Sequence, residues 1–430
     1  MRQRMCQLNF PITTKSSPNR NYKEDCHNMF LTNKAASKRW LTFSLLALIG
    51  LTACEETNTV GVDFIQESSI QVDTVLIDQI DLVEIDPYLG QLTYSALGSF
   101  EDPLFGELSS TLYFKPSINA SSTDTVLDYM RFEMRLHLME DEIYGDTSST
   151  AEFDVYRIQQ SWHGPSFRQS TDIDLELERI GGFSDADIDT NGNVHIALGG
   201  SWDSFYREIF NIDDDSTRLT RYAEEDFGLA IVPKNTTNRI RFATMSTSRL
   251  LVIGQEDTSS YGMQDWAYNI ERRGVDPIPN RLMLHNTFEQ VLKIDLNSLG
   301  NQLPNSNFVR AELVLEEDTT RAKTSLSEHE QRLDVPGFRM SEGDFIDLAY
   351  QFGFSDQNII NGYPAKGRFR FDITQLLNDQ IYNNNPIKDS YIYPYVNAGY
   401  IGSNILYSKS APPEKRPRLI IYFIQSEEVK

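Results

Sequence analysis

Apolar and polar residues alternate along most of the chain beyond residue 70, and this two-residue period predicts β-strands. In Tyr129–Leu138, apolar side chains at every second position oppose Arg, Glu and His on the other face. Gln71–Val83 alternates in the same way, and so do shorter segments at Phe153–Gln159, Val194–Leu198, Phe227–Val232, Arg239–Thr244 and Leu250–Ile253. Gly, Asp, Asn and Ser clusters separate them, as turns require. The pattern predicts an all-β protein made of half-buried strands.

Two short helices interrupt this pattern, at Trp202–Phe210 and Ile373–Tyr382, and a weak internal repeat surrounds them. In the first half, a strand at Tyr129–Leu136 is followed by a second strand that leads into a helix, and a third strand ends this half. The second half has the same order. The matched segments are Tyr129–Leu136 with Phe308–Leu315, Val194–Leu198 with Phe369–Ile373, and Arg249–Ile253 with Pro417–Phe423.

The repeat predicts two consecutive β-sandwich domains. We place the first at residues 71–253 and the second at residues 277–430. We expect residues 254–276, which contain the polar stretch QEDTSS, to form a linker between the two domains.

Residues 29–53 have the form of a secretory signal peptide. Lys34, Lys38 and Arg39 provide a basic region, and Leu41–Leu51 is an apolar run of eleven residues, too short for the roughly 20 that span a bilayer as a helix. The run ends at Leu-Thr-Ala-Cys54, which resembles the lipobox of bacterial lipoproteins. That resemblance implies acylation of the Cys54 thiol and cleavage just before it.

The signal begins some distance into the chain, and Met29 offers a natural start for it. Residues 1–28 show no periodicity, so we expect them to be an upstream extension without a structural role. Residues 54–70 read as a tether between lipid and domain. Glu55 and Glu56 resemble the surface-export signal of Bacteroidota lipoproteins, which implies an outer-membrane protein facing the cell exterior.

The charge of the chain argues against nucleic acid as a partner. It carries 39 Lys and Arg against 62 Asp and Glu, for a net charge of −23. Such a surface repels a phosphate backbone. Cleavage before Cys54 would also remove Cys6 and Cys26, so no intrachain disulfide is expected.

The segment Leu97–Gly106, with the sequence LGSFEDPLFG, is followed by Leu112–Phe114. This motif resembles a Bacteroidota lipoprotein family catalogued as domain of unknown function 4270. Read physically, Asp102-Pro103 favours a change from extended chain to turn, and Gly106 permits a positive φ. We therefore expect a shaped turn here, with a direct ligand role as the alternative.

A second resemblance is to DNRLRE-type jelly-roll modules, some of which bind polysaccharide. It rests on the strand Phe153–Ile158, the pair Ser161-Trp162, and the closing strand Pro417–Tyr422. The resemblance implies jelly-roll topology and makes Trp162 a candidate ligand-binding residue. Trp202 and Trp266 could also stack on sugars, but large aromatic residues more often fill a core. The second half has no evident counterpart of Trp162.

One acidic segment resembles the first half of a calcium-binding loop. Asp187, Asp189 and Asn191 alternate and precede a glycine, and Asp185 lies two residues upstream. Leu198 stands where the bidentate Glu of an EF-hand belongs, so only a looser calcium turn is expected. A plain Asn-Gly turn into the following strand explains the same residues.

Catalytic signatures are few, and we expect no enzyme activity. His329-Glu330 begins a metalloprotease-like motif, but Leu333 occupies the position of the second His. The sequence lacks a nucleophile elbow and a phosphate loop. We expect a membrane-anchored module that binds a glycan or an outer-membrane protein, with no cofactor unless calcium binds. A hydrolase of surface glycans is the alternative.

Overall fold

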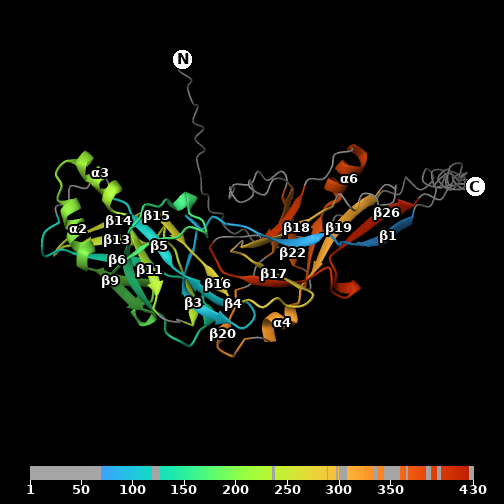
Figure 1. Ribbon diagram of the computed structural model, residues 1–430, viewed down its shortest axis with the longest axis horizontal. Helices are drawn as coiled ribbons and strands as arrows, with labels where there is room; N and C mark the ends of the chain where they lie inside the picture. Colours follow the sequence, from blue (N-terminus) through green and yellow to red (C-terminus); the bar gives the residue numbers. More distant parts are fainter. Residues whose placement is uncertain are drawn as a thin grey trace, which may run out of the picture. The chain divides into compact units, whose positions relative to one another are not determined.

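The computed structural model describes residues 69–118, 126–140, 142–234, 238–287, 289–296, 299, 308–324, 326–333, 337–342, 359–364, 367–383, 389–394 and 399–425. All of them lie within one compact unit, residues 67–430. Most of the described chain is strand in antiparallel sheets (Figure 1), which confirms the predicted all-β sandwich fold. Within these ranges, no helix has the length and apolar character needed to cross a membrane. The upstream extension, the signal peptide, Cys54, Glu55 and Glu56 lie outside the described residues.

The first half of the described chain builds three sheets. The central one has the order β15 (Met263–Tyr268), β5 (Leu112–Pro116), β11 (Leu229–Pro233), β8 (Glu152–Ile158) and β9 (Leu175–Ser184). A second has the order β16 (Glu271–Arg273), β4 (Gly106–Ser110), β3 (Ser95–Asp102), β12 (Arg239–Ala243), β7 (Tyr144–Asp146) and β20 (Glu330–Gln331). The third has the order β10 (Asn193–Leu198), β6 (Arg131–His137), β13 (Arg249–Ile253) and β14 (Thr258–Tyr261).

The central sheet is buried on both faces at β5 and β11. Leu112 and Phe114 of β5 join one hydrophobic cluster, whereas Tyr113 between them joins another. Helices α2 (Gly200–Phe210) and α3 (Asp215–Glu225) cover the first cluster, into which Trp202 and Tyr222 insert. Strands buried on both sides lose the alternation of apolar and polar residues, which explains why β11 is a continuous apolar run and not the alternating strand expected at Phe227–Val232.

The second half builds a sheet of nine strands. Their order is β1 (Ser69–Leu76), β26 (Arg418–Gln425), β19 (Phe308–Glu316), β23 (Arg368–Asp372), β22 (Ile359–Pro364), β21 (Phe338–Glu342), β24 (Ser390–Pro394), β18 (Gln290–Ile294) and β2 (Ile80–Glu84). β1 and β2 stand at opposite ends of this order, although only residues 77–79 separate them. Leu313 and Leu419 share one core with Met340 and Ile392 from the other end of the sheet. The sheet therefore folds over this core as a sandwich.

Smaller elements complete this half. They are helices α4 (Thr319–Thr324) and α6 (Thr374–Asn383) and the two-stranded sheet of β17 (Arg281–His285) and β25 (Ser403–Tyr407). The predicted helices at Trp202–Phe210 and Ile373–Tyr382 are confirmed as α2 and α6. Helix α3 was not predicted, although its start has a recognisable signal: the Asp214 side chain accepts a hydrogen bond from the Thr217 N–H at 2.7 Å.

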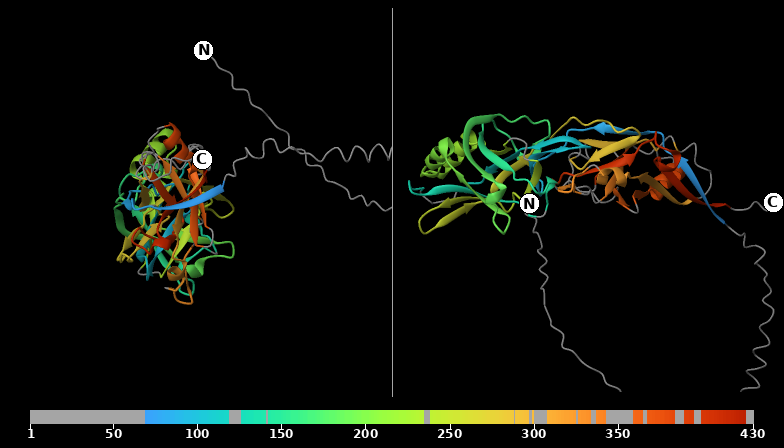
Figure 2. Two further views of the ribbon diagram at one scale, coloured as in Figure 1. Left: turned by 90° about the vertical axis from the view of Figure 1, so that its right-hand side faces the viewer. Right: turned by 90° about the horizontal axis from the view of Figure 1, so that it is seen from below.

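The expected division of the chain is wrong in two places. Residues 71–84 are expected in the first sandwich at residues 71–253, but β1 pairs with β26 and β2 pairs with β18. In Figure 2 the blue strand β1 accordingly lies beside the red C-terminal strands. Residues 254–276 were expected to be a linker, but they contain β14, β15 and β16. Alternation shows that a strand forms but not which strand it pairs with, and this explains both errors.

The internal repeat is confirmed by strand order and by register. β6 lies between β10 and β13, and β19 lies between β23 and β26. Leu136 pairs with Val194 just as Leu315 pairs with Phe369. The two four-stranded units differ in their last member. In the first, the hairpin strand β14 follows β13, whereas in the second the N-terminal strand β1 occupies that position beside β26.

Candidate functional site: two linked polar networks

The turn of the LGSFEDPLFG segment, Asp102 to Gly106, connects β3 to β4. The Asp102 carboxylate accepts hydrogen bonds from the N–H groups of Leu104 at 2.8 Å and Phe105 at 3.1 Å. Gly106 has a φ of 76°, and a Cβ there would lie 2.2 Å from the Arg273 carbonyl oxygen. The predicted turn is therefore present, and both its aspartate and its glycine are required by its geometry.

The same aspartate forms a buried ion pair with a residue 230 positions away. Arg332 Nε lies 2.6 Å from Asp102 Oδ2, Arg332 Nη2 contacts Oδ1, and the Tyr144 hydroxyl donates to Oδ2 at 2.8 Å. Burial raises the pKa of Asp102, but the hydrogen bonds and charge of Arg332 outweigh it and hold this pKa below its ordinary value. The carboxylate is thus kept ionised in a dry site.

Phe105 extends this contact into the second half of the chain. Its fully buried ring lies 5.0 Å from the Arg332 guanidinium and packs edge-on against the His285 ring at 5.5 Å. Arg272 donates to the Phe105 carbonyl at 3.1 Å and pairs with Glu289 at 2.9 Å. We call Asp102, Phe105, Arg272, His285 and Arg332 the joint, because they connect β3, β4 and β16 with β17 and the residues after β20.

The joint histidine is a structural group. Burial lowers the pKa of His285 to about 3, so the ring is neutral at physiological pH. Its Nδ1 lies 2.6 Å from the Ser403 hydroxyl, across the pair of strands β17 and β25. A neutral ring with a hydrogen-bonded nitrogen packs against Phe105 at little cost.

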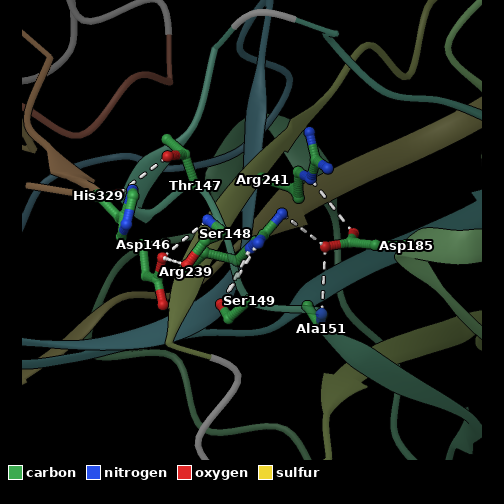
Figure 3. A network of polar contacts seen from close by, with 9 residues as sticks. All are labelled: Asp146, Thr147, Ser148, Ser149, Ala151, Asp185, Arg239, Arg241 and His329. Carbon is green, nitrogen blue, oxygen red and sulfur yellow. Dashed lines mark hydrogen bonds and ion pairs between the residues drawn. The ribbon is translucent and has the colours of Figure 1, made fainter.

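A second network, drawn in Figure 3, lies at the other end of β7 and β12. Arg239 and Arg241 project from β12 toward Asp185, at 2.9 Å and 3.2 Å, and all three side chains are nearly buried. Nearby, the Thr147 N–H and hydroxyl donate to the His329 carbonyl at 2.7 Å and 2.9 Å. The hydrogen bonds between Thr147 and His329 thus connect the residues around β20 to the first half.

The proposed calcium ligands Asp185, Asp187 and Asp189 each accept hydrogen bonds from other parts of the protein. Besides its two arginines, Asp185 accepts from the Ala151 N–H at 3.1 Å. Asp187 accepts from the Ser184 N–H at 2.7 Å, and Asp189 accepts from the Asn191 N–H at 2.8 Å. The Asp185 carboxylate thus belongs to a long-range ion pair, and the carboxylates of Asp187 and Asp189 serve separate local turns. Among the described residues, no group of three or more His, Cys, Asp or Glu side chains is arranged to hold a metal ion.

The turn alternative describes this segment well. The Asp189 N–H donates to the Asn193 carbonyl at 2.8 Å and the Gly192 N–H returns to the Asp189 carbonyl at 3.1 Å. Gly192 has a φ of 74°, which favours glycine. Hydrogen bonds from the backbone of Asn193 and Asn191 lower the pKa of Asp189, as they do for a carboxylate that caps a turn.

The candidate ligand-binding tryptophan is half-buried. The Trp162 indole N–H donates to the Phe227 carbonyl at 2.7 Å, and its ring packs edge-on against Tyr113 and Phe167. Trp202 is fully buried, and the indole N–H of Trp266 donates to the Leu92 carbonyl at 2.9 Å. Each of these rings therefore contributes to the packing of the first half.

One further buried cluster was not predicted from the sequence. Asp226, at the end of α3, is fully buried, and its carboxylate accepts from the Tyr206 hydroxyl at 2.9 Å. Burial raises the pKa of Asp226 and lowers that of Lys115, whose Nζ donates to the Asp226 carbonyl at 2.6 Å. The Tyr222 hydroxyl donates to the Pro116 carbonyl. The cluster thereby holds both helices against β5, and sequence spacing gives no sign of it.

No protein-family model matches the chain, and no curated protein is detectably similar to it. The resemblances noted above therefore remain expectations, and any functional conclusion depends on the geometry and the sequence signals of this chain.

Proposed function

We propose that the protein is an outer-membrane lipoprotein that acts by binding, as an assembly module for another outer-membrane protein. Acylated Cys54 would anchor it, and Glu55 and Glu56 would direct it to the cell exterior. In this proposal the β-sandwich unit is a non-catalytic scaffold, and residues 54–68 connect it to the lipid.

The observation that carries the proposal is the joint. Its buried charged and aromatic residues connect the two halves: Arg332 lies 2.6 Å from Asp102, and Phe105 packs on His285. Buried polar groups that are fully hydrogen-bonded stabilise one arrangement of the elements around them. A protein that must present a fixed surface to a partner benefits from such coupling.

A glycan ligand is the second candidate. The observation in its favour is that Trp162 remains half-exposed beside Tyr113, so part of one aromatic ring is open to stacking. We favour a protein partner because the Trp162 indole N–H, which would orient a sugar, already donates to Phe227.

The test has two arms. Metabolic labelling with an alkynyl fatty acid should mark the wild-type chain and not Cys54→Ala, because the thiol is the acylation site. Affinity purification after crosslinking in intact cells should then recover a stoichiometric outer-membrane protein. Absence of label on the wild type would refute the anchor. Glycan-array binding that is lost in Trp162→Ala, without a protein partner, would favour the glycan.

A further inference from the structure

Exposed apolar side chains gather where the chain enters the folded unit. Ile70, Val72, Val309 and Ile424 are 64%, 59%, 53% and 40% exposed, and they are four of the seven exposed large apolar side chains of the described residues. Ile70 pairs with Ile424, and Val72 pairs with Tyr422. Val309 lies at the β-bulge of β19 beside the same end of β26. We call these residues the entry patch.

The strand that carries most of the entry patch extends beyond the core. Each side chain from Ile70 to Thr74 is exposed, whereas Val75 packs against the core of the second half. β1 is also the last strand of its sheet, so among the described residues no further strand pairs with its outer edge. An apolar edge strand left in water invites association, and natural proteins cover such strands.

Cationic side chains border the entry patch. Tyr422 pairs with Arg310 on its other side, so Val72, Tyr422 and Arg310 form one row across three strands. This row and those that follow it on the same outward face carry four arginines, Arg310, Arg368, Arg370 and Arg418, against three carboxylates, Glu312, Glu316 and Asp372. Positive charges thus outnumber negative charges on this face, whereas the whole chain has a net charge of −23.

We infer that the entry patch rests on the lipid surface of the membrane, with Ile70, Val72 and Ile424 in contact with the bilayer interface. Apolar side chains beside cations suit the boundary between acyl chains and anionic headgroups. The inference rests on the proposed function, because it needs the Cys54 anchor. Residues 54–68 are fifteen in number, and a chain of that length spans at most about 50 Å when fully extended. The anchor therefore keeps Ser69 close to the bilayer.

A fluorescence experiment on the full acylated chain tests this inference. Cleavage before Cys54 removes Cys6 and Cys26, and the Cys54 thiol is acylated, so a single free cysteine carrying an environment-sensitive fluorophore is introduced as Val72→Cys or Ile424→Cys. The matched control is Leu177→Cys, because Leu177 is also an exposed apolar strand residue, 99% exposed on β9 of the first half. Each protein is reconstituted into vesicles of phosphatidylethanolamine and phosphatidylglycerol that contain a spin-labelled lipid.

We expect the lipid label to quench the fluorophores at positions 72 and 424 at least twofold more than the one at position 177. Equal quenching at all three positions, or none, in protein that floats with the vesicles would overturn the inference while leaving the anchor intact. Protein that does not float with the vesicles would overturn the anchor itself. A blue shift at position 72 before lipid is added would also overturn the inference, because a second copy of the chain would then cover the patch.

Discussion

At the scale of single residues, the joint depends on one charge. Asp102 is fully buried with Arg332, so its replacement by Asn leaves a buried guanidinium without its counter-ion. Breaking a buried ion pair in this way costs about 3–5 kcal/mol. We expect Asp102→Asn to lower the free energy of unfolding by this amount at neutral pH, measured by urea denaturation.

The matched control is Glu152→Gln, which removes the exposed pair with Lys234 and should cost at most about 1 kcal/mol. The pH dependence gives an independent readout. Since the folded pKa of Asp102 lies below its ordinary value, its stabilisation is complete above the unfolded pKa of about 4 and disappears as the pH falls through the folded pKa. Asp102→Asn should flatten this acid limb. Equal losses in both variants would contradict the role given to Asp102.

At the scale of elements, the completion of a sheet by β1 makes a position-specific prediction. The Ile77 N–H donates to the Pro417 carbonyl, and hydrogen-bonded pairs alternate in an antiparallel ladder. Asp73 pairs with Ile421, so its N–H points toward β26. The Thr74 N–H instead forms a hydrogen bond with the Asp73 side chain. Both positions are exposed.

Asp73→Pro should consequently destabilise the second half by about 1–3 kcal/mol, because proline removes a ladder hydrogen bond. Thr74→Pro, one residue along on the same exposed strand, should cost less because its N–H points away from β26. Hydrogen exchange of the amides of β26 is the measurement. If both variants accelerated exchange equally, the pairing of β1 with β26 would not be the cause.

The same elements show what the sequence could and could not predict. Periodicity located several of the strands, and the matched segments of the two halves have equivalent registers in the structure, Leu136 with Val194 and Leu315 with Phe369. It could not assign β1 to the C-terminal half, because a strand pattern carries no information about its partner. For the same reason Asp185 was added to the candidate calcium turn of Asp187, Asp189 and Asn191, since its ion pair with the distant Arg239 leaves no local spacing in the sequence.

At the scale of the whole molecule, the joint should make the two halves unfold together. Arg332 and Phe105 join residues of both halves, and Phe105 is fully buried among them. Phe→Ala in a buried site costs about 3–5 kcal/mol through lost contacts and a cavity. We expect scanning calorimetry to show one transition for the wild type and two separated transitions for Phe105→Ala, because loss of the Phe105–His285 contact weakens the coupling of the two halves at the joint.

The control for this experiment is Leu108→Ala, which lies three residues further along in β4 and is fully buried within the core of the first half. Its loss should lower the melting temperature by a comparable amount, because a large-to-small change in a core has a similar cost. It should leave a single transition, since the contact of Phe105 with His285 is intact. Two transitions already present in the wild type would mean that the halves are independent and that the joint does not couple them.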